Sequence, residues 1–212
     1  MKVPTAVIIS GAGSNLQAII DYWKACDPAY DLKLVISNQA QAKGLVRAVK
    51  AGLPVMVIDH KKFATREAFD ADLHQSLKDQ GIELIALAGF LRLLSDKFVK
   101  DWAGKMINIH PSLLPAFPGL KTHQKALKYG VRYSGCSVIF VDEGVDSGAI
   151  IEQAVVPVLD GDTEMDLALR VLKEEHRIFP LALDEVAHGR VKLVDGLVVR
   201  TPQDDQEGVK KL

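Results

Sequence analysis

The stretch "TAVIISGAGSNLQAII", residues 5–20, decides the fold. Its first part, 5–10, is a short β-branched apolar run of the kind that forms buried strands. Two glycines then turn the chain, and Leu16, Ile19 and Ile20 recur at the spacing that places side chains on one side of a helix. A buried strand, a glycine turn and an amphipathic helix predict the first unit of a parallel α/β sheet.

The same alternation continues through the first half of the chain. Strands are predicted at 32–37, 54–58, 83–89 and 106–110, and helices at 43–52, 66–81 and 96–104. Because the strands are almost wholly apolar, both faces of their sheet must be covered. The predicted fold class is therefore α/β: a Rossmann-like, open, mostly parallel sheet with helices on both faces.

The second half is more irregular. The elements expected there are a helix at 123–130, longer strands at 135–141 and 149–158, one long helix at 164–189 and a hairpin at 192–200. The partial alternation of the two longer strands indicates pairing near an edge of the sheet. We expect a single domain over residues 1–189, with the hairpin and a polar tail, 190–212, attached to it.

Composition excludes several classes of protein. The net charge of -1 argues against binding to nucleic acid or to an anionic membrane. No apolar run is long enough to span a bilayer, and no leader peptide is visible, so we expect a cytoplasmic protein. Cys26 and Cys136 match no metal spacing and are expected to be small buried apolar residues, and no metal is predicted. The oligomeric state stays open between monomer and homodimer.

The glycine turn after the first strand predicts an anion site. Gly11 and Gly13 let the backbone turn tightly, and the helix that follows points unpaired N–H groups at the mouth of the loop. Ser14 and Asn15 could add side-chain donors. These features suit a phosphate group; the alternative is a plain turn with a Ser or Asn cap and no ligand.

A dinucleotide site fits the sequence less well. The third glycine of that motif is replaced by Leu16, and the second strand ends in Ser37 and Asn38 rather than in an acidic residue. One phosphate is therefore favoured over a pyrophosphate.

The strand at 106–110 ends in polar residues. Asn108 and His110 are spaced by two, which puts them on one face, and Pro111 then ends the strand. Ligands of open parallel sheets bind at the carboxyl ends of the strands. A charged imidazole beside an amide forms a pair of donors for a developing oxyanion.

A catalytic histidine usually has an acid that orients it. The segment "VDEGVDSGAII", 141–151, offers Asp142, Glu143 and Asp146, and spacing alone does not choose among them. No nucleophile stands near the Asn–His pair, which favours direct transfer between two bound substrates over a covalent intermediate.

Five segments together resemble a known family. "SGAGSNLQAII", "LAGFLRLLS", "INIHPSLLPAFPG", "THQKAL" and "VDEGVDSGAII" are similar in order and spacing to the phosphoribosylglycinamide formyltransferase family of the folate-dependent formyltransferase superfamily, up to about Gly189. The resemblance implies an enzyme of purine biosynthesis. It would transfer the formyl group of its co-substrate, 10-formyltetrahydrofolate, to the amine of glycinamide ribonucleotide, with no other partner implied.

The resemblance also implies roles for residues. The catalytic residues would be Asn108, His110 and Asp146, which resolves the choice among the three acids. The nucleotide would be bound by Gly13, Ser14, Asn15 and Glu175. The folate would be bound by Arg66, Leu91, Arg92, Leu93, Leu94 and Asn108. Two positions depart from the family pattern: Lys121, where some relatives carry His, and Ser147, where Gly is common.

Two other interpretations stay open. The first is a different formyl-transferring or formyl-hydrolysing relative, although a methionyl-tRNA formyltransferase is expected to carry a further C-terminal domain and a formyltetrahydrofolate deformylase an N-terminal regulatory domain. The second is a non-catalytic nucleotide-binding module that uses only the glycine loop.

Overall fold

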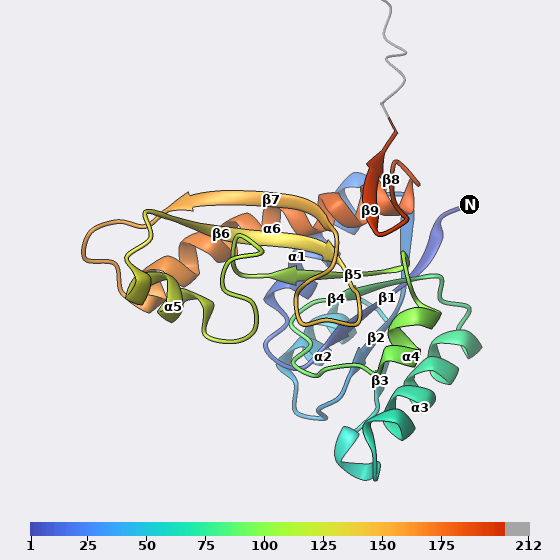
Figure 1. Cartoon of the computed structure of the whole chain (residues 1–212). Coiled ribbons are helices and arrows are strands. Elements are labelled where there is room, and N and C mark those ends of the chain that lie inside the picture. The colour runs from blue at the N-terminus through green and yellow to red at the C-terminus, as the bar shows by residue number, and fades with distance from the viewer. Residues whose placement is uncertain (202–212) are drawn as a thin grey trace, which may run out of the picture.

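The computed structural model describes residues 1–201 as a seven-stranded sheet, helices on both of its faces and a separate two-stranded hairpin (Figure 1). The strands are β1 (Val3–Ile9), β2 (Tyr30–Ser37), β3 (Val55–Val57), β4 (Leu84–Leu87), β5 (Met106–His110), β6 (Tyr133–Phe140), β7 (Ile150–Pro157), β8 (Val191–Val194) and β9 (Leu197–Arg200). The helices are α1 (Ser14–Cys26), α2 (Lys43–Lys50), the 3-10 helix η1 (His60–Lys62), α3 (Arg66–Asp79), α4 (Asp96–Asp101), α5 (Thr122–Tyr129) and α6 (Glu164–Ala187).

The sheet confirms the predicted fold class. Its strand order is β3-β2-β1-β4-β5-β6-β7, and the first five strands in this order are parallel. The last two are antiparallel to their neighbours, so the irregular second half of the chain extends one edge of the sheet, as the alternation of its strands indicated. The carboxyl ends of β1 and β5 consequently lie at the same edge, on either side of β4.

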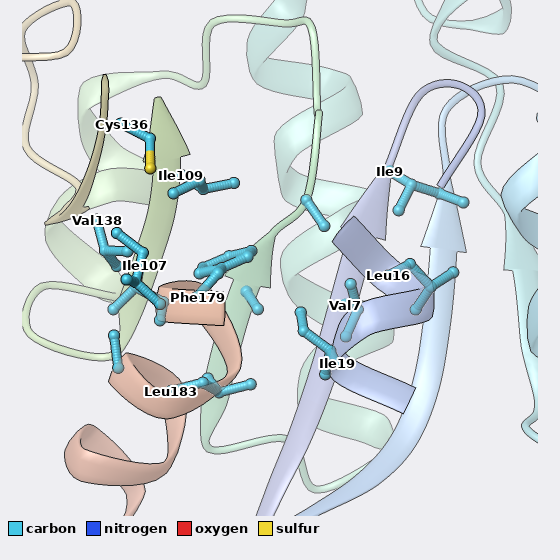
Figure 2. Close-up of a cluster of buried hydrophobic side chains, with 14 of the residues drawn as sticks. Val7, Ile9, Leu16, Ile19, Ile107, Ile109, Cys136, Val138, Phe179 and Leu183 are labelled. Atoms are coloured by element: carbon cyan, nitrogen blue, oxygen red, sulfur yellow. The ribbon is translucent and has the colours of Figure 1, made fainter. Parts of the chain in front are cut away.

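Two hydrophobic clusters cover the two faces of the sheet. One includes residues of α1, α2, α5 and α6, and the other includes residues of α3 and α4 (Figure 1). Labelled side chains of the first cluster in Figure 2 are Val7, Ile9, Leu16, Ile19, Ile107, Ile109, Cys136, Val138, Phe179 and Leu183. Because Ile107 and Ile109 point into this cluster, Asn108 and His110 point to the opposite face of β5, as predicted.

Helix α6 is the longest element and starts at a full capping box. The Thr163 hydroxyl accepts a hydrogen bond from the Asp166 amide, and the Asp166 side chain accepts one from the Thr163 amide. The helix continues through Pro180 to Ala187, so the single long helix predicted from the sequence is confirmed.

The structure also bears on smaller predictions about the two cysteines, the hairpin and the tail. Cys26, expected to be buried, is exposed at the last residue of α1, whereas Cys136 is buried in β6, as expected. Strands β8 and β9 form the predicted hairpin around Asp195 and Gly196. The polar tail lies outside the described residues from 202 on, and the domain boundaries remain a prediction.

Among the helices described, none combines the length and the apolar composition that crossing a bilayer requires.

Candidate active site

The end of β5 lies inside the sheet, where two neighbours hold it in place. Asn108 pairs with Leu87 of β4 on one side and with Ile139 of β6 on the other. Its side chain is half-buried, and within residues 1–201 its amide group makes no hydrogen bond, so the amide donors are available to a ligand. His110 follows two residues later and is 5% exposed.

The His110 imidazole lies between two acceptors. Its Nδ1 is 3.2 Å from Oδ2 of Asp146, and its Nε2 is 3.1 Å from the carbonyl oxygen of Phe117. A carboxylate and a carbonyl can only accept, so the protonated ring, with an N–H on each nitrogen, is the form that satisfies both contacts. The geometry therefore suits a cationic His110.

Of the three acids that spacing left open, the structure puts only Asp146 beside His110. Asp142 instead accepts hydrogen bonds from the Gly144 amide and the Ser147 hydroxyl, at 3.1 and 2.8 Å. Glu143 faces Lys100 at 3.8 Å. The choice that the family resemblance implied is the one that the geometry supports.

Asp146 is held as a carboxylate by its partners. The His110 hydrogen bond chiefly, and then the Gly119 amide at 2.8 Å, hold the pKa of Asp146 below its usual range, although burial acts against them. The Asp146 backbone has φ 51, a left-handed conformation that Asp tolerates better than most residues. This conformation turns the carboxylate toward the loop at 111–121.

That loop is tied to the sheet by two polar side chains, the buried Ser137 and the half-buried Gln153. The Ser137 hydroxyl donates to the Ser112 carbonyl at 2.7 Å and accepts from the Leu114 amide at 3.0 Å. The Gln153 amide donates to Ser137 Oγ and to the Leu114 carbonyl, at 2.8 and 3.0 Å. These bonds fix the segment that carries Phe117, and no local pattern in the sequence identified Ser137 or Gln153.

Phe117 adopts a conformation that is unusual for an aromatic residue. Its φ of 55 lies in the left-handed region, which bulky side chains rarely occupy. The ring packs against Tyr129 with 5.6 Å between centroids. The Phe117 carbonyl accepts from both His110 Nε2 and the Ser112 hydroxyl, so the strained residue closes one side of the His110 imidazole.

The glycine loop lies at the carboxyl end of β1 and leads into α1. Gly13 caps the helix with φ 72, and no side chain caps the amides that follow, which leaves backbone donors for an anion. Ser14 is half-buried at the first helical position. Asn15 is buried, and its amide donates one hydrogen bond to Glu175 Oε2 at 2.6 Å.

Glu175 connects the glycine loop with the neighbourhood of His110. Burial raises the pKa of the Glu175 carboxyl, while the hydrogen bond from Asn15 and the charge of His110 oppose that rise. The structure therefore brings the predicted nucleotide residues and the predicted catalytic histidine into one electrostatic neighbourhood.

The predicted folate residues form a rim beside β4. Leu91 and Leu93 are 72% and 58% exposed, which leaves an apolar surface open to a ligand, and Leu94 is half-buried. The Arg92 guanidinium lies over the Phe69 ring at 5.0 Å. Arg66 is exposed at the start of α3, where its one described side-chain partner is Glu67 at 3.4 Å.

His123 is a further polar residue near this site that the sequence did not single out. Burial chiefly, and then the charge of His110, lower the pKa of His123, and its Nδ1 is buried without a hydrogen-bond partner in the described chain. A histidine at the start of α5 carries no local signal, because its proximity to His110 depends on how the loop at 111–121 folds back.

An open, mostly parallel sheet with polar groups gathered at its carboxyl edge defines a ligand-binding α/β protein of the Rossmann-like class. Among residues 1–201, no group of three or more histidine, cysteine, aspartate or glutamate side chains is arranged to hold a metal ion. The polar cluster consists of an amide, an imidazole and a carboxylate, a set suited to stabilising charge and moving protons.

Comparison with known proteins narrows this class to a family. The sequence model of the formyl transferase family matches residues 2–183. Phosphoribosylglycinamide formyltransferase of Escherichia coli K12 is 46% identical over 187 residues, which cover 88% of each chain. The crystal structure of glycinamide ribonucleotide transformylase 1 from Symbiobacterium toebii superposes with a TM-score of 0.92 at 44% identity, covering 95% of both chains.

A longer relative is also similar. The trifunctional purine biosynthetic protein adenosine-3 of Drosophila pseudoobscura pseudoobscura is 52% identical over 201 residues, but the chain spans only 15% of its length. The chain belongs to the formyl transferase family, and within it to the phosphoribosylglycinamide formyltransferases. The prediction of an enzyme that transfers a one-carbon group is thereby confirmed.

Proposed function

We propose that this protein transfers the formyl group of 10-formyltetrahydrofolate to the amine of glycinamide ribonucleotide, giving formylglycinamide ribonucleotide and tetrahydrofolate in purine biosynthesis. The observation that carries the proposal is the pair of His110 and Asp146, 3.2 Å apart beside Asn108, in a chain of this family. Substrates bound by the glycine loop and by the apolar rim would meet at that pair.

The reaction starts when the amine nitrogen of the nucleotide attacks the formyl carbon. A carbon–nitrogen bond forms, and an electron pair moves onto the formyl oxygen. The Asn108 amide and the His110 N–H donate hydrogen bonds to that oxygen, each at its most favourable when the charge is fully developed. Asp146 acts through His110, because its carboxylate keeps the ring oriented and cationic.

The tetrahedral intermediate then collapses. The bond between the formyl carbon and the folate nitrogen breaks, and that nitrogen takes up the proton which the attacking amine has lost. His110, or a water molecule held by Asp146, relays this proton. No covalent bond to the protein is needed at any step, in keeping with a sequence in which no nucleophile motif accompanies Asn108 and His110.

His110 Nε2 must exchange one acceptor for another during this sequence. In the structure Nε2 faces the Phe117 carbonyl at 3.1 Å. We propose that the formyl oxygen replaces this carbonyl as substrates bind, so that the ring donates to substrate without losing its contact with Asp146. The imidazole then passes from one acceptor to another and its charge is never left unpaired.

An amine-dependence assay tests the proposed function. The purified chain is supplied with 10-formyltetrahydrofolate, with and without glycinamide ribonucleotide, and the release of tetrahydrofolate is followed by absorbance. We expect turnover only when the nucleotide is present. Release of formate without it would make the protein a deformylase, and no turnover under either condition would leave a nucleotide-binding module.

A further inference from the structure

Helix α2 packs directly on the glycine loop. A Cβ placed on Gly13 would lie 2.6 Å from Cα of Gly44, in the first turn of α2, so the two backbones touch. The Gly44 amide donates to the Gly11 carbonyl at 3.0 Å. The N-termini of α1 and α2 therefore converge on the loop at 11–15, and both contribute positive backbone charge to it.

Arg47 extends from the second turn of α2 to the same loop. Its Nε donates to the Ala12 carbonyl at 3.0 Å, and its Nη1 donates to Gln17 Oε1 at 3.4 Å. The Nη2 group makes no hydrogen bond within residues 1–201, and no carboxylate in that part of the chain pairs with the guanidinium. One edge of the Arg47 guanidinium, Nε and Nη1, is thus hydrogen-bonded within the protein, while the N–H groups of Nη2 remain available to a ligand.

A groove of about 540 Å³ starts at this position. Among the residues that line it are Ser14 and Gln17 of α1, Arg47 of α2 and His176 of α6. Burial chiefly, and then the charge of Arg47, lower the pKa of His176, and the charge of Asp21 opposes this shift. Gln17 Nε2 in turn donates a hydrogen bond to Asp21 Oδ1 at 2.8 Å, and Asp21 lies one turn of α1 farther from the loop. At the loop itself, Arg47 is a cationic side chain that hydrogen-bonds to the loop backbone.

We propose that Arg47 binds the phosphate of the nucleotide substrate and makes the site selective for a phosphorylated ribose; the proposal rests on the function proposed above. A phosphate monoester carries a charge of about -1.5 to -2 near pH 7. Each helix N-terminus supplies only about +0.5, so α1 and α2 together supply about +1. The guanidinium offsets the remainder, and its planar fork suits two phosphate oxygens.

Three variants test this proposal by steady-state kinetics. In Arg47→Ala we expect the KM for glycinamide ribonucleotide to rise about tenfold or more, while kcat and the KM for 10-formyltetrahydrofolate stay within about twofold of the original protein. Inorganic phosphate, used as a competitive inhibitor, should bind Arg47→Ala weaker by a similar factor. Arg47→Lys keeps the positive charge but loses the planar fork of the guanidinium. Its KM for the nucleotide and its inhibition constant for phosphate should lie between those of the original protein and those of Arg47→Ala.

Lys50→Ala is the matched control. Lys50 lies in the last turn of α2 and is exposed, so this variant removes one positive charge from the same helix without touching the glycine loop. We expect all of its constants to stay unchanged.

The outcomes distinguish phosphate binding by Arg47 from structural support of the glycine loop by the same side chain. An unchanged nucleotide KM and an unchanged phosphate inhibition constant in Arg47→Ala overturn the proposal. So does a rise in both substrate KM values together with a fall in kcat, since that pattern marks damage to the loop that Arg47 supports through Ala12. If the unaltered protein does not turn over the nucleotide, the proposed function fails instead, and calorimetric titration of inorganic phosphate into the same variants still tests Arg47.

Discussion

At position 110 a buried imidazole has an acceptor on each side, and only one of the two is a side chain. Asp146 fixes Nδ1, and the Phe117 carbonyl occupies Nε2. This arrangement leaves Asn108 as the residue whose donors are free before substrate arrives. The two groups at the end of β5 therefore start the reaction in different states, although both are proposed to stabilise the same oxygen.

Removing either donor should slow the chemical step. A single preorganised donor contributes about 3 kcal/mol to a transition state of this kind. We expect Asn108→Ala and His110→Ala each to lower kcat by about a hundredfold or more, measured with both substrates saturating. A thermal melt of each variant is the control, because a fold that is lost also abolishes turnover. Near-normal kcat in a folded variant would refute the assignment.

Asp146→Asn should show whether the negative charge of Asp146 matters for turnover, because Asn has nearly the same shape as Asp but no charge. The amide oxygen can still accept a hydrogen bond from His110 Nδ1, but the variant leaves no negative charge beside the imidazole. We expect a large loss of kcat with only a modest fall in the melting temperature near pH 7, so that the variant stays folded. A variant that loses its fold rather than its rate would show that Asp146 is structural.

The same variant predicts a pH dependence of stability. The pKa of Asp146 is lowered in the folded state, from about 3.9 in the unfolded chain. Its contribution to the free energy of unfolding is therefore fully present above about pH 4 and is lost as the pH falls through the folded-state pKa. Urea unfolding of the original protein and of Asp146→Asn between pH 7 and 3 should show their difference shrinking below about pH 4; a difference that is constant over this range would contradict the prediction.

Sequence patterns predict the positions of some of these site residues but not of others. The period of two places Asn108 and His110 on one face without any knowledge of the fold. Spacing does not separate Asp146 from Asp142 and Glu143, because the choice depends on a left-handed backbone turn and on where the loop closes. The hydrogen bond from Asn15 to Glu175 joins residues that are 160 positions apart, beyond any local pattern.

At the scale of elements, hydrophobic period and turn residues predict almost every strand and helix. The strand predicted at 83–89 ends earlier, at Leu87, because Gly89 takes φ 77 and turns the chain out of the sheet. The ties from Ser137 and Gln153 to the loop at 111–121 could not be predicted, since they join β6 and β7 to a segment with no period of its own.

The contact between α1 and α2 predicts a difference between two glycines. Gly13 and Gly52 both have positive φ, 72 and 80, but a Cβ on Gly13 would lie 2.6 Å from Gly44 Cα whereas one on Gly52 would meet nothing within 4 Å. Gly52→Ala should lower the free energy of unfolding by about 1 kcal/mol from backbone strain alone. Gly13→Ala should lower it by a further 1–3 kcal/mol, roughly the cost of forcing an extra methyl into a filled space. Denaturant unfolding of both variants measures this difference, and equal losses would show that the two backbones do not touch.

At the scale of the whole molecule, Asn15 and Glu175 join the first helix to the last long one. Figure 1 shows α1 and α6 on the same side of the sheet. The pKa of Glu175 is raised by burial above the value of about 4.3 in an unfolded chain. Its protonated form therefore adds stability below about pH 4, and this contribution is lost as the pH rises through the folded-state pKa.

Glu175→Gln removes this pH dependence, because Gln cannot ionise and its carbonyl still accepts from Asn15. We expect the variant to gain stability relative to the original protein as the pH rises from about 4 to 8. Urea unfolding across that range measures the difference between the two proteins. A difference that does not change with pH would show that Glu175 titrates alike in the folded and unfolded chains.

The contact between His110 and Phe117 has a consequence for how this enzyme can vary. The oxygen that occupies the imidazole belongs to the main chain, and every amino acid supplies the same atom. No exchange of one side chain for another deletes it. Mutation can alter this restraint only by reshaping the path of the loop, so natural or engineered tuning of access to the imidazole must act at the anchors of that path rather than at the blocking atom itself.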